Sequence, residues 1–210
     1  ISLILVDMNQ PGVKVSPIKL ISGASPFCET HFDNAIAPAT DLIGGVDRGW
    51  TVGKRLLQFE RSTHAGINIS GSQGGRSEKS EMPSLVSKYV GRQDGQLADA
   101  DLRRQLTQFE MNAHAQRITQ RRAIEELQSR APGFTSSAVK LTNALNIQEG
   151  DELLVAAMGP QGFRWDPETA DAEELASLQK WLYQKSLTIA GGTKEVQLNI
   201  IAKRVLGLPD

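Results

Sequence analysis

Residues 99–133 read DADLRRQLTQFEMNAHAQRITQRRAIEELQSRAPG, a stretch with neither proline nor glycine before its last two residues. This pattern predicts one long helix over about 99–129, which Ala131-Pro132-Gly133 ends. A second long helix is predicted from residue 135 or 136 to residue 158, where Gly159-Pro160 follows. Long helices that follow one another closely favour an antiparallel bundle.

The helical period begins at Asp47 and continues to the end of the chain. Further helices are predicted from Asp47 to about Ile67, from Pro83 through Tyr89, from Asp171 to about Ile189 and from Thr193 onward, with a loop over 91–95. Gly71–Gly75 weakens the far end of the first of these helices. We therefore expect a mainly α chain, in which residues 44–210 form an up-down bundle of the four-helix type.

Residues 1–43 have β character instead. Apolar or alternating runs over 1–8, 13–20 and 27–36 predict three strands, and Pro38 then leads the chain out of the sheet. Three strands cannot bury both faces by themselves. We therefore interpret residues 1–43 as the last strands of a β domain whose other strands lie upstream, in a longer protein.

Composition sets limits on the function. The chain has 210 residues and a formal net charge of -1, which gives no signature of nucleic-acid binding. Its single cysteine, Cys28, excludes an internal disulfide and fits a reducing, cytoplasmic compartment. No apolar run approaches the ~20 residues needed to span a membrane. The three histidines show no metal-ligand spacing, so no metal site is predicted.

Glu60 is the main candidate for catalysis. It follows Leu56 by four residues and Leu57 by three, so the three side chains share one helix face. Burial of this face raises the pKa of a carboxylate and makes it a base for a weakly acidic C–H group. Spacing alone favours a different interpretation, a glutamate at the edge of the apolar stripe that is paired with Lys54, Arg61 or His64, because exposed or paired glutamates are the common case.

A second candidate site is the pair Gly191-Gly192 at the start of the last predicted helix. Glycines let the backbone approach a ligand closely, and Thr193 is a predicted N-cap. Thr193 and Glu195 are also explained by ordinary capping and by a favourable charge in the first turn.

Taken together, these segments resemble the C-terminal half of an acyl-CoA dehydrogenase. Residues 32–44 are similar to the exit from the family's middle β domain, residues 49–61 to its first bundle helix, and residues 191–206 to its terminal motif. The family carries its catalytic glutamate either just before the glycine-threonine pair or on the first bundle helix, immediately before an arginine. Here the first place is Gly191 and the second is Glu60, before Arg61, as in the branch of isovaleryl- and long-chain acyl-CoA dehydrogenases.

The resemblance implies an FAD-dependent reaction of fatty-acid β-oxidation type. Glu60 would remove the α-proton of an acyl-CoA thioester to give trans-2-enoyl-CoA. The backbone amide of Gly191 would polarise the thioester carbonyl, with Arg61 as a second substrate-binding residue. Gly191, Gly192, Thr193 and Glu195 would contact FAD. Electron-transfer flavoprotein is the implied electron acceptor, and a dimer or tetramer, homo- or hetero-oligomeric, is the implied assembly.

Two motifs depart from the family pattern. Many relatives carry Arg-x-x-Phe-Gly after the first bundle helix, whereas this chain reads Ser84-Leu85-Val86-Ser87-Lys88-Tyr89-Val90-Gly91-Arg92. Either Arg92, Arg103 or Arg104 replaces that arginine at the flavin pyrophosphate, or this subunit contributes less to flavin binding. The bundle glycine motif is also altered, to Met158-Gly159-Pro160-Gln161-Gly162-Phe163. Both changes resemble divergent bacterial members, some of which are hetero-oligomers with one flavin-competent subunit.

Two alternative functions follow. The chain could belong to a catalytically silent subunit that serves assembly, with Glu60 kept for structural reasons. It could also belong to a related flavin monooxygenase or nitroalkane oxidase, although a glutamate in place of an aspartate as the base argues against the oxidase.

Overall fold

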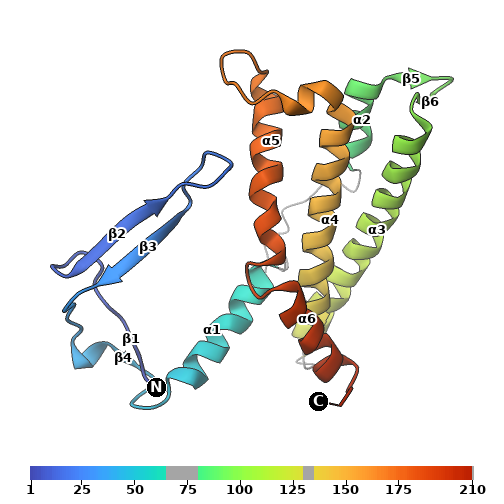
Figure 1. Ribbon diagram of the computed structural model, residues 1–210. Helices are drawn as coiled ribbons and strands as arrows, with labels where there is room; N and C mark the ends of the chain where they lie inside the picture. The colour runs from blue at the N-terminus through green and yellow to red at the C-terminus, as the bar shows by residue number, and fades with distance from the viewer. Residues whose placement is uncertain (65–79, 130–134, 210) are drawn as a thin grey trace. The chain divides into compact units, whose positions relative to one another are not determined.

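The computed structural model describes residues 1–64, 80–129 and 135–209 (Figure 1). The chain divides into two compact units, Ile1–Glu60 and Arg61–Asp210. The predicted boundary at residue 43 falls inside the first unit and stays a prediction about the domains of the full-length protein. The predicted features at Ile67, Gly71–Gly75 and Ala131–Gly133 lie outside the described residues.

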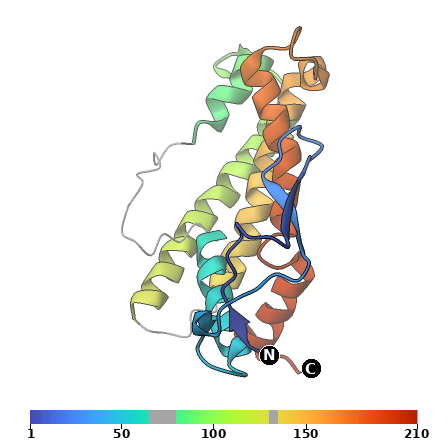
Figure 2. The ribbon, with the colours of Figure 1, turned by 90° about the vertical axis from the view of Figure 1, so that its left-hand side faces the viewer.

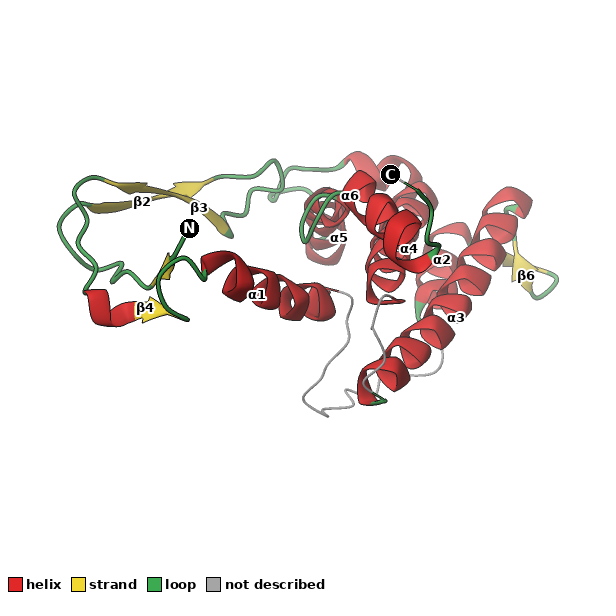
Figure 3. Ribbon diagram, turned by 90° about the horizontal axis from the view of Figure 1, so that it is seen from below, coloured by secondary structure: helices red, strands yellow, loops and turns green. Residues whose placement is uncertain are grey.

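The first unit contains two short antiparallel strand pairs. Strand β2 (Val13–Ile18) pairs with β3 (Phe27–Phe32), and β1 (Leu3–Ile4) pairs with β4 (Leu42–Ile43) after the short helix η1 (Ala39–Asp41) (Figure 3). The strands are shorter than predicted, because a turn that bonds Leu20 to Ala24 follows β2 and Asn34, with φ 54°, follows β3. The strand β4 was not predicted from the sequence.

Helix α1 (Gly49–His64) completes this unit. The helix predicted from Asp47 begins at Gly49 instead: Asp47 has φ 60°, and the first helical bonds run from Thr51 and Val52 to the carbonyl of Arg48. The predicted apolar face is present, but its side chains are not buried within the described structure, where Leu56 is 61% exposed and Leu57 42%.

The second unit is helical, as predicted. It contains α2 (Met82–Val90), the hairpin β5 (Arg92–Gln93) and β6 (Gln96–Leu97), α3 (Ala100–Gln128), α4 (Thr135–Met158), η2 (Gly159–Phe163), α5 (Ala172–Gln184), η3 (Lys185–Thr188), α6 (Lys194–Ile200) and the π-helical turn η4 (Ile201–Val205). The hairpin lies where the sequence predicts a loop, and the helix predicted to reach Ile189 changes to a 3₁₀ turn after Gln184. Helices α3, α4 and α5 run alternately up and down (Figures 1 and 2).

Helix α4 lies at the centre of this unit and contacts α2, α3, α5 and α6. The largest apolar cluster joins α2, β6, α3 and α4 and consists of Val86, Leu97, Leu106, Leu153 and Ala157. Gly150 permits the close contact between α3 and α4, because a Cβ atom there would lie 2.9 Å from Cε2 of Phe109. A smaller cluster, Ala123 with Val139, joins the other ends of the same two helices.

Side chains cap three of the helices. Asp99 accepts from the backbone amides of Asp101 and Leu102 before α3, both at 2.9 Å. Asp171 accepts from Glu173 and Glu174 before α5, and Thr193 from Val196 before α6, as predicted. Among the described helices, none is long and apolar enough to cross a bilayer.

Replacing Leu153 by alanine tests the core. Leu153 is 3% exposed, and its loss should lower the free energy of unfolding by about 2–5 kcal/mol through lost burial and a cavity. Leu145→Ala on the same helix is the control, because Leu145 is 41% exposed and should change stability by about 0.5 kcal/mol. Urea unfolding measures both variants; equal effects would contradict the assigned core.

Candidate functional site

The glycine turn, residues 191–193, connects η3 to α6. Gly191 has φ 66° and Gly192 φ 99°, a left-handed region that side chains disfavour. A Cβ atom on Gly192 would also lie 2.7 Å from Nε2 of Gln197. The backbone path therefore requires both glycines, and close packing against α6 requires Gly192.

Two buried side chains bind the carbonyl groups of the glycine turn. Nε2 of Gln197, which is fully buried in α6, donates to the carbonyl oxygen of Gly191 at 2.9 Å. Nζ of Lys140, which is 2% exposed in α4, donates to the carbonyl oxygen of Gly192 at 2.6 Å. Sequence analysis missed both residues, although a lysine between Val139 and Leu141 and a glutamine on the face of Ile200 and Ile201 were visible signals.

The amide groups of the glycine turn are available to donate hydrogen bonds to a ligand. All described peptide bonds are trans, so the N–H groups of Gly192 and Thr193 point away from the carbonyls that Gln197 and Lys140 hold. Within the described residues, the amides of Gly191, Gly192 and Thr193 donate to no protein acceptor. Such fixed donors suit a thioester carbonyl or a phosphate oxygen, so the turn fits the expected FAD and acyl-CoA contacts.

Thr193 and Glu195 close the first turn of α6. The Thr193 hydroxyl oxygen accepts from the amide of Val196 at 3.3 Å. Hydrogen bonds from its own backbone amide and from the Thr193 hydroxyl hold the pKa of Glu195 below its usual value. Glu195 is thus an ionised carboxylate with a local capping role, and its predicted contact with FAD stays a prediction.

Glu60 and Arg61 lie at the boundary between the two units, on α1. Glu60 is half-buried, and the side chain of Arg61 lies outside the described part of the chain. The structure does not test the roles predicted for either residue, and both stay predictions.

The three arginines considered as replacements for the family arginine are bonded locally. Arg92 donates to the carbonyl of Gly95 at 3.2 Å and Arg103 to that of Leu97 at 2.9 Å, so both secure the β5–β6 hairpin. Arg104 pairs with Asp101 at 2.8 Å on α3. These bonds give each arginine a structural role within its own subunit.

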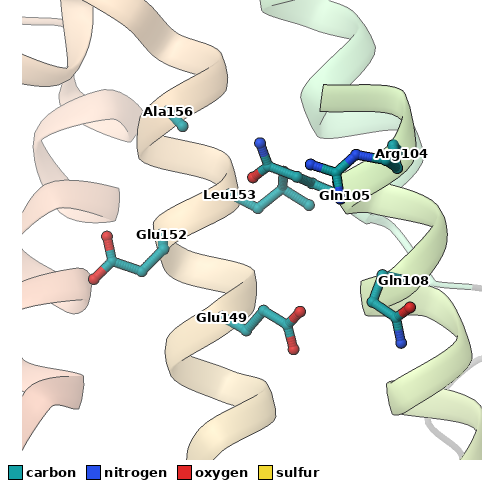
Figure 4. A pocket seen from close by; sticks show the side chains of 7 residues that line it. All are labelled: Arg104, Gln105, Gln108, Glu149, Glu152, Leu153 and Ala156. Atoms are coloured by element: carbon teal, nitrogen blue, oxygen red, sulfur yellow. The ribbon is translucent and has the colours of Figure 1, made fainter. Parts of the chain in front are cut away.

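Arg104 also lines a groove of about 440 Å³ between α3 and α4. Figure 4 shows Arg104, Gln105 and Gln108 on one helix, facing Glu149, Leu153 and Ala156 on the other. The polar lining does not suit an apolar acyl chain. Glu149 follows Lys140 by nine residues, about 14 Å along α4, so this groove is separate from the glycine turn.

The other polar candidates have local partners. His31 lies 3.1 Å from Glu29 on the exposed strand β3, and Cys28 is a free, exposed thiol. In the described part of the chain, no three His, Cys, Asp or Glu residues are placed to share a metal ion.

Comparison with known proteins identifies relatives for the whole chain. Residues 47–206 match the family model described as acyl-CoA dehydrogenase, C-terminal domain. The chain is 32% identical over 209 residues to the acyl-CoA dehydrogenase IpdE1 of Mycolicibacterium smegmatis, covering 100% of this chain and 49% of that protein. It is 30% identical over 210 residues to the acyl-CoA dehydrogenase FadE34 of Mycobacterium tuberculosis, covering 100% and 27%. The chain thus spans half or less of the length of these relatives.

Solved structures share the fold. The Tcur3481–Tcur3483 steroid ACAD has a TM-score of 0.79 at 23% identity, covering 99% of this chain and 52% of that one. The ChsE4–ChsE5 complex from Mycobacterium tuberculosis has a TM-score of 0.73 at 19% identity, covering 100% and 53%. PigA with FAD and proline has a TM-score of 0.75 at 17% identity, covering 99% and 52%.

Gly192→Ala tests the backbone requirement of the glycine turn. Its methyl group would meet Gln197 and break the buried bond to Gly191, in addition to the strain of the left-handed backbone. Gly207→Ala is the matched control, because Gly207 has φ 64° and no atom within 4 Å of its added Cβ. We expect Gly192→Ala to lower the free energy of unfolding by roughly 1–3 kcal/mol more than the control. Equal losses in chemical unfolding would mean that Gln197 does not hold the turn.

Proposed function

Because this chain belongs to the acyl-CoA dehydrogenase family, we propose that the full-length protein oxidises an acyl-CoA thioester to the trans-2-enoyl-CoA. The observation that carries the proposal is the glycine turn, whose carbonyls are bound by buried side chains and whose amides have no acceptor among the described residues. This arrangement matches the electrostatic need of the reaction, which builds negative charge on the thioester oxygen.

Glu60 is the proposed base. Its carboxylate takes the pro-R α-proton, the Cα–H and Cβ–H bonds break, a C=C bond forms, and the β-hydrogen leaves with its electron pair. FAD, when bound, supplies the two-electron oxidant for this step. Support for Glu60 comes from its position on α1 before Arg61, one of the two places where the family carries its base, and from the glycine at the other place.

The glycine turn has the complementary role of binding the thioester. A hydrogen bond from the amide of Gly191 to the thioester oxygen stabilises the enolate-like charge that develops as the α-proton leaves. Gly192, Thr193 and Glu195 are the proposed FAD contacts on this segment, and Arg61 is a proposed substrate contact. Thr193 orders the segment through its cap to Val196.

The proposed partners are electron-transfer flavoprotein as electron acceptor and further subunits of a homo- or hetero-oligomer. Two structural neighbours, the Tcur3481–Tcur3483 steroid ACAD and the ChsE4–ChsE5 complex, each carry the names of two proteins. Exposed apolar residues on α3, such as Met111 and Ile118, support association through the helical unit.

A silent subunit of a hetero-oligomer is the second candidate. It is favoured by the absence of the Arg-x-x-Phe-Gly stretch and by the local bonds of Arg92, Arg103 and Arg104, each of which binds a group of its own segment. Flavin content separates the two candidates, because an active full-length protein should be yellow and bleach with its acyl-CoA.

Glu60→Gln in the full-length protein tests the proposed base. The amide keeps the shape of the side chain but cannot accept the proton, so turnover should fall by about a hundredfold or more while flavin and acyl-CoA still bind. Turnover with an artificial electron acceptor across a panel of acyl-CoA substrates measures the effect. Glu125→Gln, an exposed glutamate on α3, is the control and should keep full turnover.

Near-normal turnover of Glu60→Gln, or failure only through unfolding, would refute the catalytic assignment. A double variant sharpens the test: Glu60→Gly with Gly191→Glu should restore part of the activity, since the family places its base at either position. Restoration should be incomplete, because φ 66° at position 191 is unfavourable for a side chain.

Flavin content of the 210-residue chain gives a separate prediction. In the family, earlier strands of the middle domain supply flavin-stacking residues, so we expect this chain purified alone to retain no tightly bound flavin. Visible absorbance after gel filtration measures the ratio of flavin to protein. A stoichiometric ratio would show that the helical unit holds FAD without those strands.

A further inference from the structure

We propose that Lys140 and Gln197 are positioning residues that together clamp the glycine turn and aim its amides at the acyl thioester. The clamp is the pair of hydrogen bonds from these side chains to the carbonyls of Gly192 and Gly191. The part that concerns the thioester rests on the proposed function, whereas the clamp itself is a property of the fold.

Lys140 is an unusual residue for the inside of a bundle. It is 2% exposed, and burial lowers the pKa of its ammonium group. Among the described residues, no carboxylate pairs with it, and its hydrogen bond goes to the carbonyl of Gly192. A buried cation is costly and a leucine or methionine would pack there more easily, so the bond to the turn is the feature that explains a lysine at this position.

Gln197 holds the adjacent peptide from the other side of the turn. Its side chain is fully buried, its amide group donates to Gly191, and its Oε1 has no partner among the described atoms. Gly192 packs so tightly against Nε2 of Gln197 that a methyl group would not fit. The turn and the glutamine are therefore interlocked, and rotation of either peptide would break the bond.

The clamp determines where the amides point. In a trans peptide unit the N–H group is antiparallel to the C=O group, so fixing the carbonyls of Gly191 and Gly192 fixes the amides of Gly192 and Thr193. The amide of Gly191 belongs to the preceding peptide unit and is held indirectly, through the Cα atom that connects it to the fixed carbonyl of Gly191. Because Lys140 lies 52 residues from Gly192, the turn is held to the central helix α4 and not only to its own segment.

The test uses the full-length holoenzyme with Lys140→Met and Gln197→Met, which keep side-chain length but remove the donors. Lys140→Arg restores a cationic donor, and Lys88→Met removes an exposed lysine of α2 as the matched control. The first readout is hydrogen–deuterium exchange of the peptide that contains residues 189–197. We expect faster exchange in both methionine variants, slower exchange again in Lys140→Arg, and no change in Lys88→Met.

The second readout is the carbonyl stretch of a bound, isotope-labelled acyl-CoA, compared with kcat and KM. Amides that no longer point at the thioester oxygen polarise the carbonyl less. The frequency of the carbonyl stretch should therefore shift back toward its value in solution. The kcat should fall about tenfold or more with little change in KM, because the loss is of transition-state stabilisation. Lys140→Arg should recover most of the shift and of kcat.

The outcomes separate the clamp from the proposed function. Unchanged exchange in both methionine variants overturns the clamp, whatever the activity. Faster exchange with an unchanged carbonyl stretch and kcat overturns the positioning role. If Lys140→Met does not fold, Gln197→Met carries the same measurements. If Glu60→Gln keeps full turnover while exchange rises in the clamp variants, the proposed base is wrong and the clamp stands.

Discussion

The second unit depends on one constraint: helix α4 contacts four other helices. Its contacts with α2, α3, α5 and α6 bury most of its surface, including Val139, Leu141, Gly150 and Leu153, and leave one exposed stripe that contains Leu145. Each polar side chain on the buried faces therefore needs a partner from a neighbouring element. Those polar contacts therefore fix how the surrounding helices sit along α4.

Lys140 and Asp151 are two polar residues of α4 that have this role. Lys140 binds the turn that begins α6, and Asp151 lies 3.4 Å from Lys180 of α5. Burial raises the pKa of Asp151, and the nearby Lys180 opposes this effect. Because the folded pKa is raised, ionising Asp151 weakens the fold as the pH rises through that pKa. Such groups contribute specificity of packing more than stability, which matches a helix that must align several partners.

The parts of the fold that the sequence predicts are those with local causes. The length of α3 follows from the absence of proline and glycine inside it, and the end of α4 from the glycine-proline pair after it. The caps Asp171 and Thr193 act within one turn. The short strand β4 and the hairpin β5–β6 consist of two-residue strands, which leave no periodic signal. Lys140 was missed because its role arises from contact between α4 and a turn 52 residues away, and Gln197 because a polar residue on an apolar helix face does not by itself show that it binds the turn six residues before it.

The glycine at position 191 connects the candidate site to the clamp. Its φ of 66° is one that a glutamate adopts only at a cost of about 1–2 kcal/mol, so a chain with its base elsewhere gains from a glycine there. In the proposed reaction Glu60 moves the proton and the glycine turn only binds the thioester oxygen. For binding the thioester oxygen, the turn needs amides in fixed directions and no side chain. The two buried donors that bind its carbonyls hold the amides in place. Gly191, Lys140 and Gln197 thus form one arrangement. Position 191 carries no side chain, and the buried donors Lys140 and Gln197 determine the direction in which the amides of the turn point.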